Sequence, residues 1–255
     1  MEEKIIKIIK KNLNPQGQKF ILELLEDYEV NEYYRLSDLK LTEELSQVAH
    51  DINHSKRCLI IADRLIGLFK KLNIKYEQVS KRLCDEKEVN MCIFAAIIMH
   101  DIGNAINRSI HHQVSSWLTI FLCRSRLKKL FPQKYPLFLS MIISGVLRHQ
   151  FESDLVPKDL ASIIVSLADK LDISQERSKD IQIKDFINTV TSEVLKIDLY
   201  IKKKKLQIDV LIKNPCALFR VEKLKGFIDK IPSKFKAIIN INVYLFKYRS
   251  KIKIL

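Results

Sequence analysis

The sequence has few of the residues that interrupt helices, with 5 glycines and 6 prolines among 255 residues. This scarcity excludes a collagen-like or linker-dominated chain and favours helices. Long apolar runs are also absent, because stretches such as Ile93–Met99 are far shorter than the roughly 18–20 residues that span a bilayer. The N-terminus lacks the basic, apolar and small-residue order of a signal peptide. We therefore expect a soluble, cytoplasmic protein with no membrane partner.

Cysteine is scarce too, and its placement excludes two common uses. The five cysteines, an odd number, include no CxxC pair: Cys58, Cys84, Cys92, Cys123 and Cys216. A disulfide framework or a cysteine-based zinc site normally shows paired, regularly spaced cysteines. We expect reduced thiols that are mostly buried.

Positive charge is abundant but unevenly distributed. The chain carries a net charge of +14, of which residues 185–255 contribute +10 from 16 Lys/Arg and 6 Asp/Glu. A basic region of this kind attracts nucleic acid or another anion. Its longest run, Lys202–Lys205, lies between two expected strands, so a solvated hairpin tip explains it equally well. Because no nucleic-acid-binding motif accompanies the lysines, nucleic acid remains an alternative partner that is not favoured.

The hydrophobic pattern divides the chain into two regions. Up to about Lys184, apolar residues recur at helical spacing, whereas beyond it they alternate as in strands. We predict a mainly α-helical protein with a helical domain over residues 1–184 and a small basic α+β extension of ββαβ order over 185–255. The expected helices cover residues 16–28, a segment starting at Thr42, 54–72, 89–99, 114–127, 136–147, 157–171 and 215–230. The expected strands cover 194–201, 206–212 and 237–246.

All six histidines lie outside the basic region, and one of them forms a conspicuous doublet with an aspartate. His100-Asp101 follows the apolar helix expected over 89–99, and Asp169 likewise emerges from an apolar helix. An imidazole and a carboxylate at the end of a buried helix cost free energy unless a partner compensates them. Neutral histidine and ionised aspartate are good ligands for divalent transition metals. The pattern therefore indicates a metal site.

These residues, together with an earlier histidine, resemble a known family. His54 in HSKRCLIIADRL, His100-Asp101 in IIMHDIGNA and Asp169 in SLADKLD follow the order of the HD-domain metal-dependent phosphohydrolases. The resemblance covers about residues 45–180. It implies an HD-domain-like helical bundle in which His54, His100, Asp101 and Asp169 hold a metal ion.

Two further histidines extend the resemblance to family members with two metals. His111 and His149 occupy the places of the additional ligands, which implies a second ion bridged to the first by Asp101. His112 competes with His111, but we prefer His111 because the family spacing continues to a small residue four positions later, here Ser115. The implied cofactor is one or two divalent transition-metal ions: Mn, Fe, Co, Ni or Zn, with Mg also allowed.

The resemblance implies a phosphohydrolase that cleaves a phosphomonoester or phosphodiester bond of a nucleotide-like substrate through a metal-activated water. Besides Asp101, we predict catalytic roles for Arg108 and Lys170, which lie beside ligands and could bind substrate phosphate; a solvated surface charge is the alternative for both. Asn104 replaces the lysine usual in the HD-GYP subgroup, and the GYP motif is absent. The similarity is therefore to stand-alone members.

Two alternatives remain open at this point. The chain could be a non-catalytic HD module that binds a nucleotide or nucleic acid through the basic C-terminal region, although retention of the whole ligand set argues against lost catalysis. His50-Asp51 is a second HD doublet, but it lacks the preceding apolar helix and the following glycine. We expect it on a helix surface or next to the ligands, where His50 could still face the site. The sequence specifies no oligomeric state.

Overall fold

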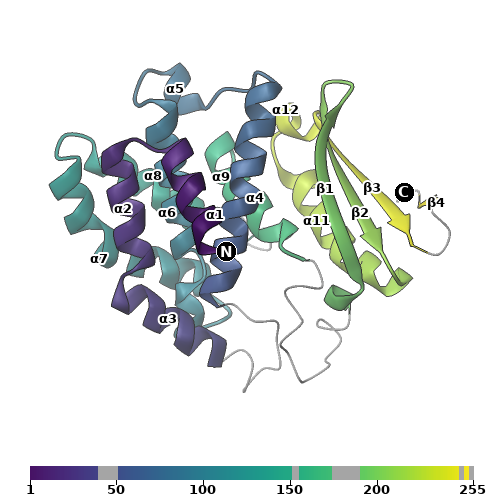
Figure 1. The fold of residues 1–255 in the computed structure, drawn as a ribbon, viewed down its shortest axis with the longest axis horizontal. Coiled ribbons are helices and arrows are strands. Elements are labelled where there is room, and N and C mark those ends of the chain that lie inside the picture. The colour runs from purple at the N-terminus through teal and green to yellow at the C-terminus, as the bar shows by residue number, and fades with distance from the viewer. Residues whose placement is uncertain (40–50, 151–154, 174–189, 247–249, 253–255) are drawn as a thin grey trace.

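The computed structural model describes residues 1–39, 51–150, 155–173 and 190–246, and the backbone of 250–252. Residues 1–173 of this set form a helical body, and residues 190–252 form a sheet unit at one side of it (Figure 1). The helical body contains α1 (Glu2–Asn12), α2 (Pro15–Leu25), α3 (Tyr28–Leu39), α4 (Ile52–Lys71), α5 (Glu77–Ser80), α6 (Glu86–Met99), the 3-10 helix η2 (Ile102–Ala105), α7 (His111–Leu130), α8 (Tyr135–Arg148) and α9 (Leu160–Leu171). The predicted mainly helical fold with a small C-terminal sheet is confirmed.

Helix α6 is the centre of the helical body. A capping box at Asp85 and Glu88 begins it, and residues 88–99 are all buried. An uninterrupted apolar sequence is stable only when neighbours surround the helix, and α2, α4, α8 and α9 provide that cover. Gly145 lets α8 approach closely, because a Cβ at this position would lie 2.8 Å from Cβ of Ala96. This packing holds α8 against α6, and the C-terminal caps of these two helices are His149 and His100.

Local capping decides where several helices begin. The expectation that the last helix of the body starts at Pro157 is wrong: α9 begins at Leu160, because the Asp159 side chain accepts a hydrogen bond from Ser162 N. Similarly, the helix expected over 16–28 ends earlier, at Leu25, and a separate helix, α3, begins at Tyr28, where Asp27 accepts from Val30 N at 2.9 Å. The helix expected from Thr42 and the boundary at Lys184 lie outside the described residues.

The sheet unit has the predicted ββαβ order, extended by one short strand. It consists of β1 (Val194–Lys202), β2 (Lys205–Ile212), the 3-10 helix η4 (Pro215–Ala217), α11 (Leu218–Lys230), α12 (Ser233–Lys236), β3 (Ile239–Leu245) and β4 (Ser250–Ile252). The sheet order is β1-β2-β3-β4, with β2 and β3 parallel and the other pairs antiparallel. The β1–β2 turn is formed by Lys203 and Lys204, whose φ angles are 51° and 57°.

The sheet unit packs against the helical body near α4. Arg64 on α4 donates to the main-chain oxygen of Leu199 on β1 at 2.7 Å, and Lys234 Nζ lies 2.8 Å from Glu77 Oε1. Buried apolar residues of the two parts form one continuous cluster. Across the described ranges, no helix is both long and apolar enough to cross a bilayer. All five cysteines are in the thiol form, and all except the half-buried Cys216 are buried, as predicted.

Candidate metal centre

The predicted ligands converge from separate helices onto one buried site. They occupy α4 (His54), the C-terminal cap of α6 (His100), the start of η2 (Asp101), the first residue of α7 (His111), the C-terminal cap of α8 (His149) and the last turn of α9 (Asp169). Apart from Asp169, each is at most 3% exposed. Residues up to 115 positions apart in sequence are thus brought together where helices end.

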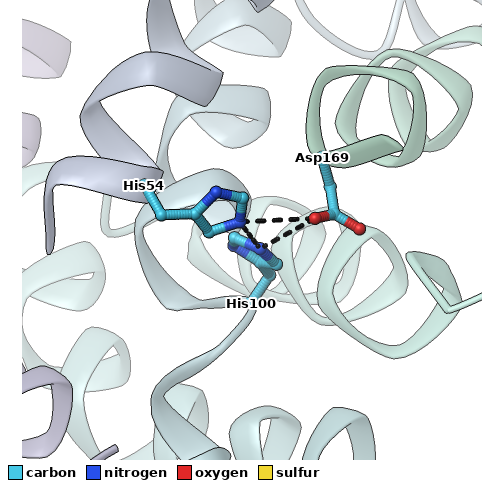
Figure 2. Close-up of side chains that lie close together, drawn as sticks. All are labelled: His54, His100 and Asp169. Carbon is cyan, nitrogen blue, oxygen red and sulfur yellow. Dashed lines mark hydrogen bonds and ion pairs between the residues drawn. The ribbon is translucent and has the colours of Figure 1, made fainter. Parts of the chain in front are cut away.

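The first group of ligand atoms consists of His54 Nε2, His100 Nε2 and Asp169 Oδ1, with Asp101 Oδ2 beside them. His54 Nε2 lies 3.3 Å from both His100 Nε2 and Asp169 Oδ1 (Figure 2). Asp101 Oδ2 lies 3.6 Å from His54 Nε2 and 3.3 Å from His100 Nε2. We call these four residues group 1.

The second group uses the other oxygen of the same aspartate. His111 Nε2 lies 3.1 Å from His149 Nε2, and these nitrogens lie 3.4 and 3.7 Å from Asp101 Oδ1. We call His111, His149 and Asp101 group 2. Asp101 therefore lies between the groups, with one carboxylate oxygen directed to each.

The hydrogen bonds of the imidazoles determine which ring nitrogen faces the site. Nδ1 of His100, His111 and His149 contacts the main-chain oxygen three residues earlier, at 2.7, 2.8 and 2.6 Å, and Nδ1 of His54 contacts Asp172 Oδ2 at 2.7 Å. Because these oxygens only accept, each Nδ1 donates, and the Nε2 of a neutral ring carries a lone pair. When the four rings are neutral, as metal binding requires, four lone pairs thus point into the site.

This arrangement fits a metal ion. Facing lone pairs at such distances repel unless a proton or a cation lies between them, and metal ligands at about 2.0–2.1 Å from one ion are naturally close to one another. The C-terminal ends of α6 and α8, which carry partial negative charge, meet here. Clusters of His54, His100 and Asp169, and of His100, Asp101 and His149, each have ligand atoms within 4.8 Å of one another. The buried cluster could therefore hold metal.

The protonation states also show that the site favours positive charge at one point. Burial lowers the pKa of His111 to about 4 and the pKa of His149 well below its usual value. Burial also opposes protonation of His100, but Asp101 and Asp169 outweigh it and raise its pKa to about 10. Burial would raise the pKa of Asp169, yet Lys170, His100 and His54 hold it well below its usual value. Cationic charge is thus stabilised between the carboxylates of group 1.

Lys170 and Arg108, predicted to contact substrate, both lie at the edge of this cluster. Lys170 Nζ is 2.7 Å from Asp169 Oδ2, and its side chain is only 18% exposed. Arg108 donates to Asn104 Oδ1 at 2.9 Å, and Asn104 in turn donates to the Asp101 main-chain oxygen. Neither is a freely solvated charge, and their contact with a substrate stays a prediction.

The competing candidates fall elsewhere. His111 Nε2 lies 3.4 Å from Asp101 Oδ1, whereas Nδ1 of His112 is buried without a hydrogen-bond partner among the described residues, so the geometry favours His111. Asp51 of the second doublet is the N-terminal cap of α4, where its side chain accepts from His54 N at 2.9 Å. His50 lies outside the described residues.

Sequence reasoning missed two residues that support the ligands. Asp172, 3% exposed, bonds His54 Nδ1 and also accepts from Arg57 Nε, which lies 3.0 Å from each carboxylate oxygen. The spacing offered a signal, because Asp172 follows Asp169 by three residues and Arg57 follows His54 by three, which places each pair on one helix face.

Glycine and tyrosine residues hold the surrounding backbone. A Cβ at Gly103 would lie 2.4 Å from the His111 main-chain oxygen, so glycine is required because η2 approaches α7 closely. Tyr34 OH bonds Ser55 Oγ at 2.5 Å and donates to Ile98 O at 2.8 Å. This contact ties α3, α4 and the end of α6 together behind the ligands.

The fold and the site define a mainly helical protein with a buried His/Asp cluster that could bind metal ions. The chain is 22% identical over 209 residues to a protein of Methanocaldococcus jannaschii described as "Uncharacterized protein MJ1020", with 80% of each chain covered. This is distant homology to an archaeal protein without a stated activity. No family model matches the chain.

Proposed function

We propose that the protein is a metal-dependent phosphohydrolase of the HD type, which hydrolyses a phosphomonoester or phosphodiester bond of a nucleotide-like substrate. One observation carries this proposal: Asp101 directs one oxygen to the His54–His100 pair and the other to the His111–His149 pair. A carboxylate shared between two sets of imidazoles suits a pair of divalent ions. Together with the motifs quoted above, this arrangement supports the HD resemblance.

The ligand residues would have distinct tasks. Group 1 would hold one ion and group 2 a second, with Asp101 common to both. When bound, such ions supply Lewis-acid stabilisation of phosphoryl charge and increase the acidity of water. Burial keeps His111 and His149 neutral at pH 7, because it lowers the pKa of His111 to about 4 and holds that of His149 well below its usual value. Both imidazoles are therefore ready to bind a cation without first losing a proton.

Two cationic residues would bind the phosphate group of the substrate. Arg108 is oriented by Asn104, and Lys170 by Asp169. Charge-assisted hydrogen bonds from both would neutralise non-bridging oxygens, and a guanidinium that is already oriented loses little freedom when it binds. The two cations would thus fix the phosphorus atom next to groups 1 and 2.

A non-catalytic role in nucleotide or nucleic-acid binding is the second candidate. It is favoured by the exposed lysines of the β1–β2 turn, Lys202–Lys205, in a region with a net charge of +10. It does not account for four inward-facing imidazoles, whose burial costs free energy without a cation. We therefore favour the enzyme.

A phosphatase and phosphodiesterase screen tests the proposal. Purified protein would be assayed with p-nitrophenyl phosphate, bis-p-nitrophenyl phosphate and a panel of nucleotides, each with Mn²⁺, Co²⁺, Ni²⁺ and Mg²⁺. We expect metal-dependent turnover that is lost in Asp101→Ala. Turnover unchanged by that substitution would contradict the proposal, as would failure to hydrolyse any substrate with any metal.

A further inference from the structure

His54 differs from the other three histidines of the site in what its Nδ1 contacts. The Nδ1 atoms of His100, His111 and His149 donate to neutral main-chain oxygens, whereas His54 Nδ1 donates to the carboxylate of Asp172 at 2.7 Å. A hydrogen bond to a charged acceptor is stronger. It fixes the ring more firmly and increases the basicity of the opposite nitrogen, which is the one that would bind a metal.

Asp172 is itself held in one orientation. It caps the C-terminus of α9, is 3% exposed, and has Arg57 Nε 3.0 Å from each of its oxygens. Arg57 lies on α4 one turn after His54, and Asp172 lies one turn after Asp169. Helices α4 and α9, which carry His54 and Asp169, therefore each supply a supporting residue as well. The pair locks α4 to α9 at group 1.

The charges around the two groups are also unequal. Group 1 contains Asp169 in addition to the shared Asp101, and Asp172 supports it from behind. Lys170 and Arg57 balance these two added carboxylates, at 2.7 Å from Asp169 and 3.0 Å from Asp172. Group 2 shares only Asp101. Arg108 adds a positive charge beside group 2, because its guanidinium donates to Asn104 Oδ1 at 2.9 Å and its charge opposes protonation of His111. Coulomb energy therefore favours a divalent cation in group 1 over one in group 2.

We propose that group 1 binds a divalent ion more tightly than group 2, and that Asp172 sets this difference as a positioning residue acting through His54. The inference rests on the proposed function only in requiring that both groups hold ions. It adds the order in which the two groups bind their ions, and it identifies Asp172 as the residue that controls this order. Asp172 contacts no ion in this account.

Titration with Mn²⁺ against a fluorescent chelator tests the inference on the full-length protein. We expect two classes of site in the wild type, and a loss of about 10- to 100-fold in the affinity of the tighter class in Asp172→Asn. The weaker class should change less than threefold. With Co²⁺ as probe, the visible absorption of the first equivalent should also shift, because the orientation and basicity of His54 change.

Asp63→Asn is the matched control. Asp63 also lies on the α4 side of the body, is 19% exposed, and accepts from Lys11 Nζ at 2.7 Å and Asn12 Nδ2 at 2.8 Å. Asp63→Asn removes the same charge as Asp172→Asn, but the described contacts of Asp63 include none of the residues of groups 1 and 2. We expect both Mn²⁺ affinities to match the wild type. An equal loss in the two variants would mean that general destabilisation, and not positioning, explains the effect, which would overturn the inference.

A second pair of variants keeps the inference testable if Asp172→Asn does not fold. His149→Gln should retain the tighter ion, and His54→Gln should lose it. Retention of the tighter ion in His54→Gln would overturn the order of filling. Wild-type protein that binds no Mn²⁺ or Co²⁺ would instead contradict the proposed function, whereas normal two-site binding in Asp172→Asn would contradict this inference alone.

Discussion

The helical body and the sheet unit bury very different polar groups. In the described part of the sheet unit, the buried polar side chains of the sheet are amides that satisfy each other: Asn242 donates to Gln207 at 3.3 Å and to the nearby Asp209 at 2.7 Å. The helical body instead buries ionisable residues, with His54, His100 and Asp101 at most 3% exposed. Neutral amides can be satisfied within a protein, but clustered imidazoles and carboxylates require a compensating charge.

The net charge is distributed in the opposite way. The +10 of residues 185–255 belongs to the region with the buried amides, while the candidate metal site lies in residues 1–184, with +4. The most abundant charged residues are therefore not those of the candidate site. The numerous lysines lie at exposed positions such as Lys203 and Lys204, whereas the candidate site consists of a few buried side chains. Four substitutions or treatments test this contrast.

The largest effect should follow from changing the residue that joins groups 1 and 2. We expect Asp101→Asn to lower the rate of hydrolysis by more than about 100-fold, above the usual effect of outer-shell partners, because both groups lose a charged ligand. Steady-state rates and bound-metal analysis would measure it. Asp209→Asn, in the sheet unit, provides the comparison and should stay within twofold of wild type. Equal losses in both would remove the distinction between the regions.

Metal removal should destabilise the helical body selectively. A ligand present at about 100 times its dissociation constant stabilises a protein by about 2.7 kcal/mol, so chelation should lower the melting temperature by several degrees. Hydrogen exchange should show the reason: α4, α6 and α9 exchange faster after chelation, while β1 and β2 do not change. Uniform loss of protection across both regions would contradict a localised site.

A substitution at the closely packed Gly103 should have the next largest effect. A Cβ at this position would lie 2.4 Å from His111 O and 2.6 Å from Ser115 N. Gly103→Ala should therefore lower the free energy of unfolding in urea by about 1–3 kcal/mol and weaken the binding of an ion by group 2. Gly67→Ala on α4 is the control, since nothing lies within 4 Å of its Cβ. That variant should be more stable by up to about 1 kcal/mol. A stable Gly103→Ala protein would show that η2 can move away.

The smallest effect concerns the β1–β2 turn. Lys203 and Lys204 both have positive φ, a conformation that costs a non-glycine residue about 1–2 kcal/mol. Replacing them with Asn and Gly, which suit this turn, should raise the free energy of unfolding by about 1 kcal/mol in urea. Mn²⁺ affinity should not change. A fall in metal affinity would link the lysine turn to the metal centre and erase the contrast between the regions.

The sequence predicted elements well wherever the periodicity was long, and less well where a single cap decides the boundary. The helix expected over 89–99 corresponds to α6, and the three expected strands correspond to β1, β2 and β3. Asp159 and Asp27 were missed because a capping side chain resembles any other surface aspartate until its backbone partner is known. Strand β4 was not expected, and its three residues are too few to show a period.

For the site, the sequence was enough to identify most of the side chains, but their spatial arrangement could be seen only in the structure. The motifs singled out His54, His100, Asp101 and Asp169, but periodicity does not tell which oxygen of Asp101 faces which imidazole. The contact between Asp172 and His54 joins residues 118 positions apart, and only the crossing of α4 and α9 brings them together. The choice of His111 over His112 likewise depends on the orientation of the first turn of α7.

The central claim is that the buried His/Asp cluster holds two divalent ions, and a direct count tests it. Protein reconstituted with Mn²⁺ and freed of excess metal would be measured by elemental mass spectrometry against protein concentration. We predict two ions per chain in the wild type and fewer than one in Asp101→Ala. A wild-type protein with no bound ion, or an Asp101→Ala protein with the full complement, would contradict the account.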